Sequence, residues 1–530
     1  MKKKKVSRPY PSTQALKSGE LRKLREQKFG SRAEFADYVG ISEKTVQNAE
    51  NGGRIKEGNA ADIASALKMR FDQLFWVREG KRPSDIGIHP RRFLGRALSS
   101  RELKVVREIA QSFGINESRL VDDVSRGINE KARLVQLLKF REQEHAIREA
   151  RKDTQLLARY YRESLAEFGL GRYAIKVDEE IIDTHIVVSS TMPTLKLNLE
   201  EERSLFRLVN SSCIAPQVTY KQIVNFMVES VLLGVRVKNE SVFCLYDVAL
   251  KFPQKPISFR IAKYLEYRLT LGSLRNEIIR GLVRSKFDVQ KTYKERKSLF
   301  PQREQLLKDA GAILDFHNRL CVGGVNVFFA VKRSDDFAFY VEERSETVAS
   351  ARREACIIPS GFHQPLASVH AAPQISVRES VFRELWEELF NGKKVISHDG
   401  HTEADWYYQY PPLAWFKRNK NCFLHEWICF GFDLIDGSYQ FGIFLIVTDP
   451  GYCEKYRRRI KTNYEFRHTG TSLVPISTKD RNGISKLLRN PLLAHTSLFT
   501  LAEGLQRLQS LDPDKRYVNI PEIKRLIQPG

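Results

Sequence analysis

The sequence predicts a multidomain protein with an all-helical N-terminal domain, a helical and mixed α/β middle, and a C-terminal region of strands around one amphipathic helix. The chain has 530 residues, and a chain of this length divides into about three or four domains. Apolar residues recur at helical spacing between Leu21 and Phe75, whereas from Val325 the pattern changes to a succession of strands and loops around one helix.

The composition is that of a soluble globular protein, with 42% hydrophobic and 28% charged residues. The longest apolar run, close to Phe441–Val447, is far shorter than the roughly 18 to 20 residues that span a bilayer. Seven scattered cysteines include no CxxC pair, which argues against a disulfide framework or a zinc cluster. We therefore expect a cytoplasmic protein without a membrane partner.

The formal net charge of +23 indicates a polyanionic partner, because a positive field attracts phosphate backbones. The basic start, Met1–Lys5, has no apolar segment after it and is therefore not a secretory signal. We interpret residues 1–18 as a disordered basic arm. It either lies along DNA or is a solvated tail.

Residues 19–80 are expected to fold as a DNA-binding domain around two short helices and a tight turn. Phe35, Ala36 and Val39 have the spacing of one helix, and Val46 and Ala49 resume it after the turn. Gly40 tolerates positive φ, Ile41 is expected to fill the corner, and Ser42 stands where an N-cap belongs.

The second of these helices is predicted to present polar side chains to the major groove of DNA. With Val46 and Ala49 packed inward, the exposed positions are those of Glu43, Lys44, Thr45, Gln47 and Asn48. Such side chains hydrogen-bond to base edges and phosphates. The predicted DNA-binding residues are Arg32, Ser42, Lys44, Thr45, Gln47, Asn48 and Arg54.

This stretch resembles the Cro and cI (XRE) family of phage-repressor helix-turn-helix regulators. The likeness runs from Leu21–Arg25 through Gly40–Ser42, Thr45 and Glu50–Gly52 to the helix Ala61–Leu67 and to Asp72–Phe75. Where that family often has Gln at the start of the first of the two helices, this chain has Arg32, which suits a phosphate contact. The resemblance implies sequence-specific binding to double-stranded DNA.

Residues 95–170 are predicted to be helical, after a boundary rich in Gly, Pro and charge near residues 80–95. Apolar spacing from Ser100 to Val124, broken at Gly114, indicates a helical hairpin. A heptad seam follows, made of Ile147, Ala150, Thr154, Leu157, Tyr161, Ser164 and Phe168. This seam either dimerises the protein, as paired recognition helices require, or packs on its own chain.

The middle region, residues 171–305, is expected to be mixed α and β and shows no catalytic constellation. Strands are predicted over Ile181–Val188 and Val242–Tyr246, and helices over Val224–Leu233 and Ile261–Leu282, the latter interrupted at Gly272. His185 is interpreted as a packed or surface imidazole.

In residues 306–530, strands are predicted over Val325–Val331 and Phe337–Val341, and a hairpin over Glu426–Val447 with its turn at Asp436–Gly437. The helix Ser376–Phe390 opens with a capping box between Ser376 and Glu379. Glu384, Glu387 and Glu388 share one face of that helix, where three carboxylates can surround Mg²⁺. The alternative is a solvated acidic face.

The order of Arg344, Pro359–Gly361 and Arg383–Glu388 resembles the Nudix hydrolase family. That box runs Gly, five residues, Glu, seven residues, Arg-Glu-x-x-Glu-Glu-x-Gly. The resemblance implies an α/β/α sandwich and metal-dependent hydrolysis of nucleoside diphosphates linked to another group. It implies metal carboxylates at Glu384, Glu387 and Glu388, with Glu384 and Glu388 catalytic in an active enzyme, and ligand contacts from Arg344, Pro359, Ser360, Gly361, Phe362 and Arg383.

The box is degenerate in this chain. The earlier Glu of the family falls on Ile375, its first Gly on Val369, and its last Gly on Phe390, with Gly392 two residues late. A missing carboxylate weakens Mg²⁺ binding and catalysis more than it weakens phosphate recognition, which also uses basic groups and backbone N–H. The sequence therefore favours a domain that binds, or once hydrolysed, a nucleotide-like ligand.

The favoured interpretation is a homodimeric transcriptional regulator whose Nudix-like domain senses a nucleotide-like effector and shifts the DNA-competent population. One alternative is an active Mg²⁺-dependent hydrolase with its own DNA-binding domain. Another is a protein-interaction scaffold without enzymatic activity.

Overall fold

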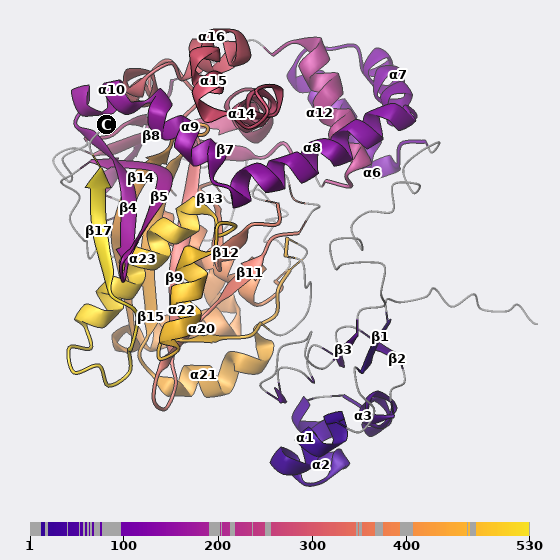
Figure 1. Cartoon of the computed structure of the whole chain (residues 1–530), viewed down its shortest axis with the longest axis vertical. Coiled ribbons are helices and arrows are strands. Elements are labelled where there is room, and N and C mark those ends of the chain that lie inside the picture. Colours follow the sequence, from indigo (N-terminus) through magenta and orange to yellow (C-terminus); the bar gives the residue numbers. More distant parts are fainter. Residues whose placement is uncertain are drawn as a thin grey trace, which may run out of the picture. The chain divides into compact units, whose positions relative to one another are not determined.

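The protein divides into two compact units, described separately below. One comprises residues 1–89 and 468–474, and the other comprises residues 90–467 and 475–530. The computed structural model of the chain (Figure 1) describes residues 12–15, 20–39, 41–51, 54–56, 59–60, 63, 66–67, 75–76, 97–189, 202, 204–211, 218–235, 237–249, 256–345, 348, 352–365, 375–392, 406–463, 465–466 and 473–528.

Three short helices of the first unit have defined bounds within the described residues, α1 (Glu20–Phe29), α2 (Arg32–Val39) and α3 (Glu43–Glu50). Their buried side chains form one small core with later apolar residues, namely Leu21, Phe35, Ala36, Val46, Ala49, Ile55, Ala60, Ile63 and Leu67. The helical prediction for this unit is confirmed, and Val46 and Ala49 face inward as expected, with no exposed surface.

The expectation of an all-helical unit needs one correction, because three strands pair in it. These are β1 (Ser12–Ala15), β2 (Arg54–Lys56) and β3 (Phe75–Trp76), in the antiparallel order β2-β1-β3. Strand β1 comes from the segment interpreted as a basic arm. Its backbone pairs with segments that are distant in sequence, so local spacing did not reveal it.

The second unit begins with a helical hairpin, α6 (Ser100–Ser112) and α7 (Glu117–Ile128), joined through Gly114 at a φ of 62°. The segment with the heptad seam follows this hairpin and is divided into α8 (Lys131–Glu149), α9 (Lys152–Tyr160) and α10 (Arg162–Glu167). Three residues of the predicted dimer seam, Ile147, Leu157 and Tyr161, are at most 1% exposed. They pack within their own chain, where α9 contacts α14, α15 and β5.

A mixed nine-stranded sheet is the centre of this unit. Its order is β16-β10-β9-β15-β14-β5-β4-β17, and β13 also pairs with β9. The strands are β4 (Leu170–Val177), β5 (Glu180–Ser189), β9 (Gly323–Lys332), β10 (Phe337–Phe339), β13 (Ser360–Phe362), β14 (Phe423–Asp433), β15 (Tyr439–Val447), β16 (Ile476–Ser477) and β17 (Ile523–Gln528). Among the described strands of this sheet, β9 and β15 are the pair that runs in parallel, and the other pairs are antiparallel.

The sheet joins regions that the sequence analysis treated as separate. Strands β4 and β5 belong to the predicted middle region, yet β5 pairs with β14 at Val187↔Phe432 and Ile186↔Asp433. The hairpin of β14 and β15 was predicted correctly, with Gly437 at its turn at a φ of 70°. Pairing with β5 covers the free edge of that hairpin, which no local pattern encodes.

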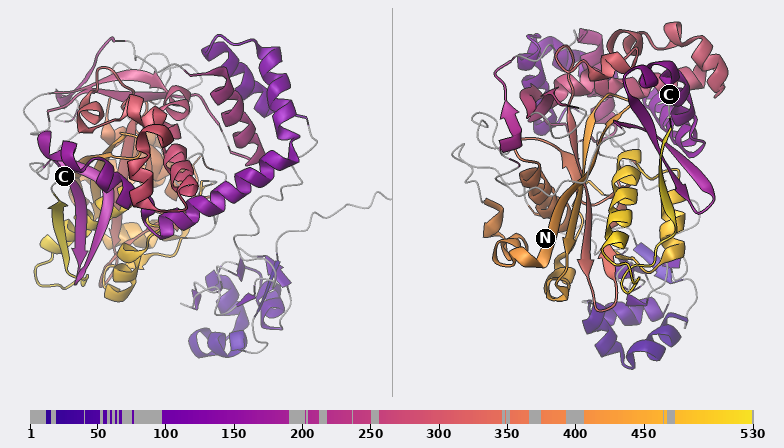
Figure 2. Two further views of the ribbon diagram at one scale, coloured as in Figure 1. Left: turned by 45° about the horizontal axis from the view of Figure 1, so that its top comes forward. Right: turned by 90° about the vertical axis from the view of Figure 1, so that its left-hand side faces the viewer.

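Helices and a second sheet cover the two faces of the central strands (Figure 2). Helix α23 (His495–Ser510) packs on β5, β9, β14 and β15, while α19 (Val377–Glu384) packs against β9 and β13. A three-stranded sheet of β6 (Phe206–Leu208), β8 (Ile257–Lys263) and β7 (Ser241–Asp247) adds aromatic contacts such as that of Phe206 with Trp427. Strand β9 is accordingly buried along almost its whole length.

One predicted helix begins later than the sequence suggested. Residues Ile261–Lys263 complete β8 by pairing with β7, and the helical segments α13 (Tyr264–Leu269), η3 (Leu271–Ser273) and α14 (Leu274–Arg284) follow, broken near Gly272 as predicted. The π-helical segment η4 (Leu385–Leu389) extends α19. The described residues include no helix that is both long and apolar enough to cross a membrane.

The remaining elements connect these layers. They are α12 (Tyr220–Leu232), α15 (Val289–Lys294), α16 (Arg296–Leu299), α17 (Pro301–Leu306), α18 (Ala310–Leu314), β11 (Val341–Glu343), β12 (Ala355–Ile357), η5 (Trp406–Gln409), α20 (Pro411–Arg418), η6 (Lys420–Cys422), α21 (Pro450–Tyr456), η7 (Arg457–Arg459) and α22 (Arg481–Arg489).

Candidate functional sites

The turn between α2 and α3 determines where α3, the helix predicted to contact DNA, begins. The hydroxyl of Ser42 accepts a hydrogen bond from the N–H of Thr45 at 3.2 Å and lies 2.8 Å from the Thr45 hydroxyl. Ile41 is half-buried and packs against the core of the unit, as predicted for the corner. Gly40 lies outside the described residues. The cap thus starts α3 at the position that the sequence indicated.

Helix α3 is polar on its outer face. The side chains of Lys44, Gln47 and Asn48 are exposed, and Thr45 is half-buried because its hydroxyl meets Ser42. Arg54 lies in β2, and its side chain is outside the described residues. Three predicted base-reading residues therefore share one exposed helix face, which is the geometry that a major groove requires.

Arg32 has a structural partner that the sequence analysis missed. Its Nε lies 2.9 Å from Glu50 Oε2, while Arg25 Nε lies 2.5 Å from Glu50 Oε1. Arg25 also donates to the carbonyl of Gly30 at 2.8 Å. Glu50 is 4% exposed, so one buried carboxylate ties α1, α2 and α3 together. The guanidinium of Arg32 is still partly exposed at the start of α2.

Residues 21–74 match the helix-turn-helix family. The matched segment covers α1 to α3 and supports a DNA-binding transcriptional regulator with double-stranded DNA as its partner. The match says nothing about the second unit. No curated protein matches the chain.

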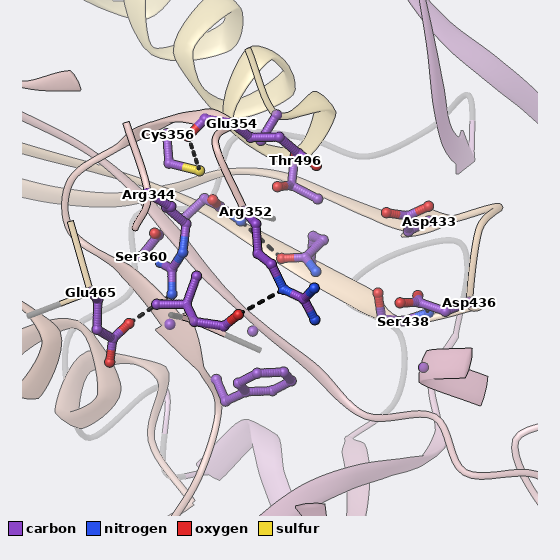
Figure 3. A pocket seen from close by; sticks show the side chains of 18 of the residues that line it. Arg344, Arg352, Glu354, Cys356, Ser360, Asp433, Asp436, Ser438, Glu465 and Thr496 are labelled. Atoms are coloured by element: carbon purple, nitrogen blue, oxygen red, sulfur yellow. Dashed lines mark hydrogen bonds and ion pairs between the residues drawn. The ribbon is translucent and has the colours of Figure 1, made fainter. Parts of the chain in front are cut away.

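The second unit contains a cavity of about 300 Å³ (Figure 3), which we call the carboxylate cavity. It lies where β9, β13 and the β14–β15 hairpin meet α8, α13 and α14. Six residues predicted from the Nudix resemblance line it, namely Arg344, Ser360, Gly361, Phe362, Glu384 and Glu387. Pro359, Arg383 and Glu388 are not among the lining residues and support the wall instead.

Hydrogen bonds to β9 and to Glu388 hold the start of strand β13 in place. The carbonyl of Pro359 accepts from the N–H of Val327 at 3.0 Å, and Ser360 donates its N–H to Glu388 Oε2 at 2.7 Å. A Cβ on Gly361 would lie 2.2 Å from the carboxyl carbon of Glu384. Only glycine therefore allows the strand to approach α19 this closely.

Arg383 is buried and engaged by its own chain. It donates to the carbonyls of Phe362 and Gln364 at 2.6 and 3.0 Å, and its Nη2 lies 2.6 Å from Glu384 Oε1. The guanidinium group of Arg383 thus holds the carboxylate of Glu384 in place. The same guanidinium fixes the segment after β13, which the sequence did not indicate.

A fourth carboxylate joins the predicted three. Arg344 Nη2 lies 2.7 Å from Glu465 Oε2, and its Nη1 lies 3.6 Å from Glu388 Oε1. Figure 3 shows Arg344 and Glu465 pointing toward each other across one end of the cavity. Glu465 lies far beyond the Nudix-like box in the sequence, and no spacing signal marks it.

Crowding of these acids raises their pKa values. Burial raises the pKa of Glu384 to about 7, and Glu387 and Glu465 add to this although Arg383 opposes it. Burial, followed by the charges of Glu384 and Glu465, raises the pKa of Glu388 well above its usual value. A proton or another cation therefore stabilises this cluster.

The predicted magnesium site requires carboxylate oxygens that meet at one point. Hard oxygen donors suit Mg²⁺, and Glu388 Oε1 is buried without a hydrogen bond. In the described parts of the chain, however, no group of three or more His, Cys, Asp or Glu side chains converges as metal ligands do. Arg383 and Arg344 instead lie against the carboxylates.

The opposite wall contains a histidine–aspartate cluster that the sequence analysis did not identify. His185 Nδ1 lies 2.8 Å from Asp433 Oδ1, and His495 Nδ1 accepts from the backbone N–H of His185 at 3.1 Å. Burial favours a higher pKa for Asp433, but His185 and Arg275 outweigh it and lower that pKa. Burial, then the charge of His185, lowers the pKa of His495. Strand pairing of β5 with β14 brings His185 and Asp433 together.

Carboxylates outnumber cationic side chains in the lining of the carboxylate cavity. Its lining includes six cationic side chains, Arg148, Lys238, Arg268, Arg275, Arg344 and Arg352, and eight carboxylates, Glu144, Glu240, Glu354, Glu384, Glu387, Asp433, Asp436 and Glu465. The site can thus accept a ligand that carries its own cation, or one that presents both hydrogen-bond donors and anionic groups.

Proposed function

We propose that the exposed face of α3 reads an operator sequence and that the carboxylate cavity binds a nucleotide-like effector that changes DNA affinity. The observation that carries the proposal is the outward placement of Lys44, Gln47 and Asn48 on a capped helix inside the matched segment. These residues contact base edges, whereas Arg32 contacts a phosphate from the start of α2. Dimeric binding to a two-fold operator would place two such helices one DNA turn apart.

Operator selection from a random DNA library tests the DNA-reading part. Lys44→Ala and Gln47→Ala are each expected to cost about 1–3 kcal/mol at the selected site and to relax base preference at one position. The matched control is Lys23→Ala, on the exposed surface of α1. Unchanged base preference in both α3 variants, at fixed salt, rules out α3 as the reader.

The effector part rests on the convergence of Arg344, Phe362 and the backbone of Ser360 and Gly361 in one cavity. A guanidinium group beside an aromatic ring suits a phosphate joined to a heteroaromatic base. A ligand that prefers one arrangement of this unit shifts DNA affinity by its difference in affinity for the two arrangements. The effector therefore acts through linkage, with no chemistry required.

Titrating a panel of nucleotide derivatives, with and without Mg²⁺, tests this effect on operator affinity. A derivative that changes affinity in the wild type should lose its effect in Arg344→Gln and keep it in Arg516→Gln, an exposed control. If the derivative changes operator affinity equally in both variants, the ligand binds outside the carboxylate cavity.

The second candidate function is hydrolysis of nucleoside diphosphate derivatives, and the raised pKa values of Glu384 and Glu388 favour it. Glu384, Glu387 and Glu388 would have to turn toward one point to hold a divalent cation, because the described residues contain no converging group of three such ligands. A cation bound there would supply charge neutralisation and polarise a phosphoryl oxygen. Arg383 holds Glu384 in place, and the Ser360 N–H holds Glu388. Mg²⁺-dependent turnover that disappears in Glu388→Gln supports the hydrolase, whereas ligand-dependent stabilisation without turnover supports the sensor.

A further inference from the structure

A second cavity, of about 370 Å³, lies in the part of the unit where the sequence shows no constellation of functional residues. Its walls come from α12, from α13 and α14, and from the segment 298–302 at the start of α17. We call it the arginine cavity. Apolar side chains form part of its lining, among them Phe226, Leu233 and Leu299.

The charge of the arginine cavity is opposite in sign to that of the first cavity. Its ionisable lining consists of four arginines, Arg268, Arg280, Arg284 and Arg352, and two glutamates, Glu229 and Glu277. The carboxylate cavity, by contrast, has more carboxylates than cations.

The two glutamates of the lining are outnumbered by its four arginines. Glu277 accepts the backbone N–H groups of Gln302 and Arg303 at 2.8 and 3.0 Å, so the start of α17 already engages its carboxylate. Glu229 Oε1 lies 3.9 Å from Arg280 Nη2, at the outer limit of an ion pair. The cavity thus retains an excess of positive charge beside apolar walls.

Two of the arginines stand at the wall that both cavities share. Arg352 donates its Nε–H to the carbonyl of Val348 at 2.9 Å, and Arg268 donates to the carbonyl of Gly272 at 3.4 Å. Burial lowers the pKa of Arg352, and the charge of Arg268 lowers it further although Glu144 opposes this. An anion between these two side chains would stabilise the charged forms of both Arg268 and Arg352.

We propose that the arginine cavity binds a phosphate-bearing small molecule whose di- or oligophosphate group contacts Arg268, Arg280 and Arg352. Guanidinium groups match phosphate oxygens in paired hydrogen bonds, and the apolar wall receives the organic part of the ligand. Apart from Arg352, the lining of this site lies outside the Nudix-like segment, and the proposal does not depend on the function proposed for the carboxylate cavity. Because Arg268 and Arg352 line both cavities, occupancy of one changes the charge that the other presents.

Isothermal titration of the full chain with inorganic pyrophosphate, at fixed physiological ionic strength and without divalent cations, tests the site. Arg280 and Arg284 line only the arginine cavity, and the double variant Arg280→Gln/Arg284→Gln is expected to weaken binding about tenfold or more. The matched control is Arg458→Gln/Arg459→Gln, which removes the same charge from the exposed segment η7. Thermal unfolding of each variant checks that the unit stays folded.

The single variant Arg344→Gln separates the two cavities, because Arg344 lines only the first. Pyrophosphate affinity that falls in Arg280→Gln/Arg284→Gln, and persists in Arg344→Gln and in the η7 control, supports the proposal. A loss confined to Arg344→Gln places the anion in the carboxylate cavity and overturns it. Equal losses in the η7 control, or the absence of saturable binding to the wild type, also overturn it.

Discussion

The helix-turn-helix unit and the carboxylate cavity both contain buried arginine–glutamate contacts, but the ratio of arginine to glutamate is reversed between them. In the first unit, the single carboxylate of Glu50 receives Arg25 and Arg32 at 2.5 and 2.9 Å. In the cavity, the single guanidinium of Arg344 lies between Glu388 and Glu465. The first network is satisfied and fixes three helices. The second has excess carboxylates, so its charge responds to protons and ligands.

The largest effect is expected from Glu50→Ala. This change leaves the guanidinium of Arg25, which is 3% exposed, without its buried partner, at a cost of about 3–5 kcal/mol in the free energy of unfolding. Hydrogen exchange of α1 to α3 in the full chain should show the loss, together with weaker DNA binding. Glu34→Ala removes an exposed carboxylate from α2 and should leave exchange nearly unchanged; similar losses in both variants contradict a structural role for Glu50.

Arg344→Met tests the excess of carboxylates in the cavity. The change removes the cation from Glu388 and Glu465, and we expect about 3 kcal/mol of destabilisation at neutral pH. The loss should be smaller near about pH 5, because the raised pKa of Glu388 lets that buried carboxyl group carry a proton there. Urea unfolding of the second unit at both pH values measures this difference. A loss that does not depend on pH means that Arg344 acts through packing alone.

The pH dependence of the wild type sharpens the comparison further. The pKa of Glu384 rises from 4.5 to about 7 on folding, so the native state keeps a proton that the unfolded chain releases. Stability from this group is complete below about pH 4.5 and is lost as the pH rises to about 7, an effect on the order of 3 kcal/mol. Unfolding midpoints across this window should fall for the wild type and fall less steeply for Glu384→Gln. Parallel slopes would contradict the raised pKa.

The smallest effect is expected from Gly361→Ala, which tests how closely β13 must approach the carboxylates. The new Cβ would lie 2.2 Å from the carboxyl carbon of Glu384 and would push it from Arg383, at a cost of about 1–2 kcal/mol. Gly451→Ala is the control, because its Cβ would lie no closer than 3.2 Å to Asp449 Oδ1. Thermal unfolding compares the two. An unchanged midpoint in Gly361→Ala shows that Glu384 moves freely.

Local signals in the sequence gave reliable predictions. The Ser42 cap, the inward positions of Val46 and Ala49, and the turn at Asp436–Gly437 all appear in the structure. Each depends on residues within a few positions of one another, where hydrogen-bond and φ preferences act directly. The strand character of Ile261–Lys263 was missed, because pairing with β7 overrode a helical spacing.

Contacts between distant segments were not predictable in the same way. Arg344 and Glu465 are 121 positions apart, and the meeting of His185 with Asp433 depends on the pairing of β5 with β14. The predicted dimer seam shows the same limit, since Ile147, Leu157 and Tyr161 are buried within their own chain. A heptad pattern identifies an apolar face but does not specify which surface covers it.

The sequence by itself determined the DNA-binding end of this protein, because a capped helix with alternating inward and outward positions is encoded by its own short stretch. It also identified the acidic face of α19. Only the tertiary structure decided which charges surround that face, and only it revealed a separate cavity rich in arginine. The physical reason is that the balance of charge in a cavity depends on side chains from several elements, and strand pairing alone brings those elements together.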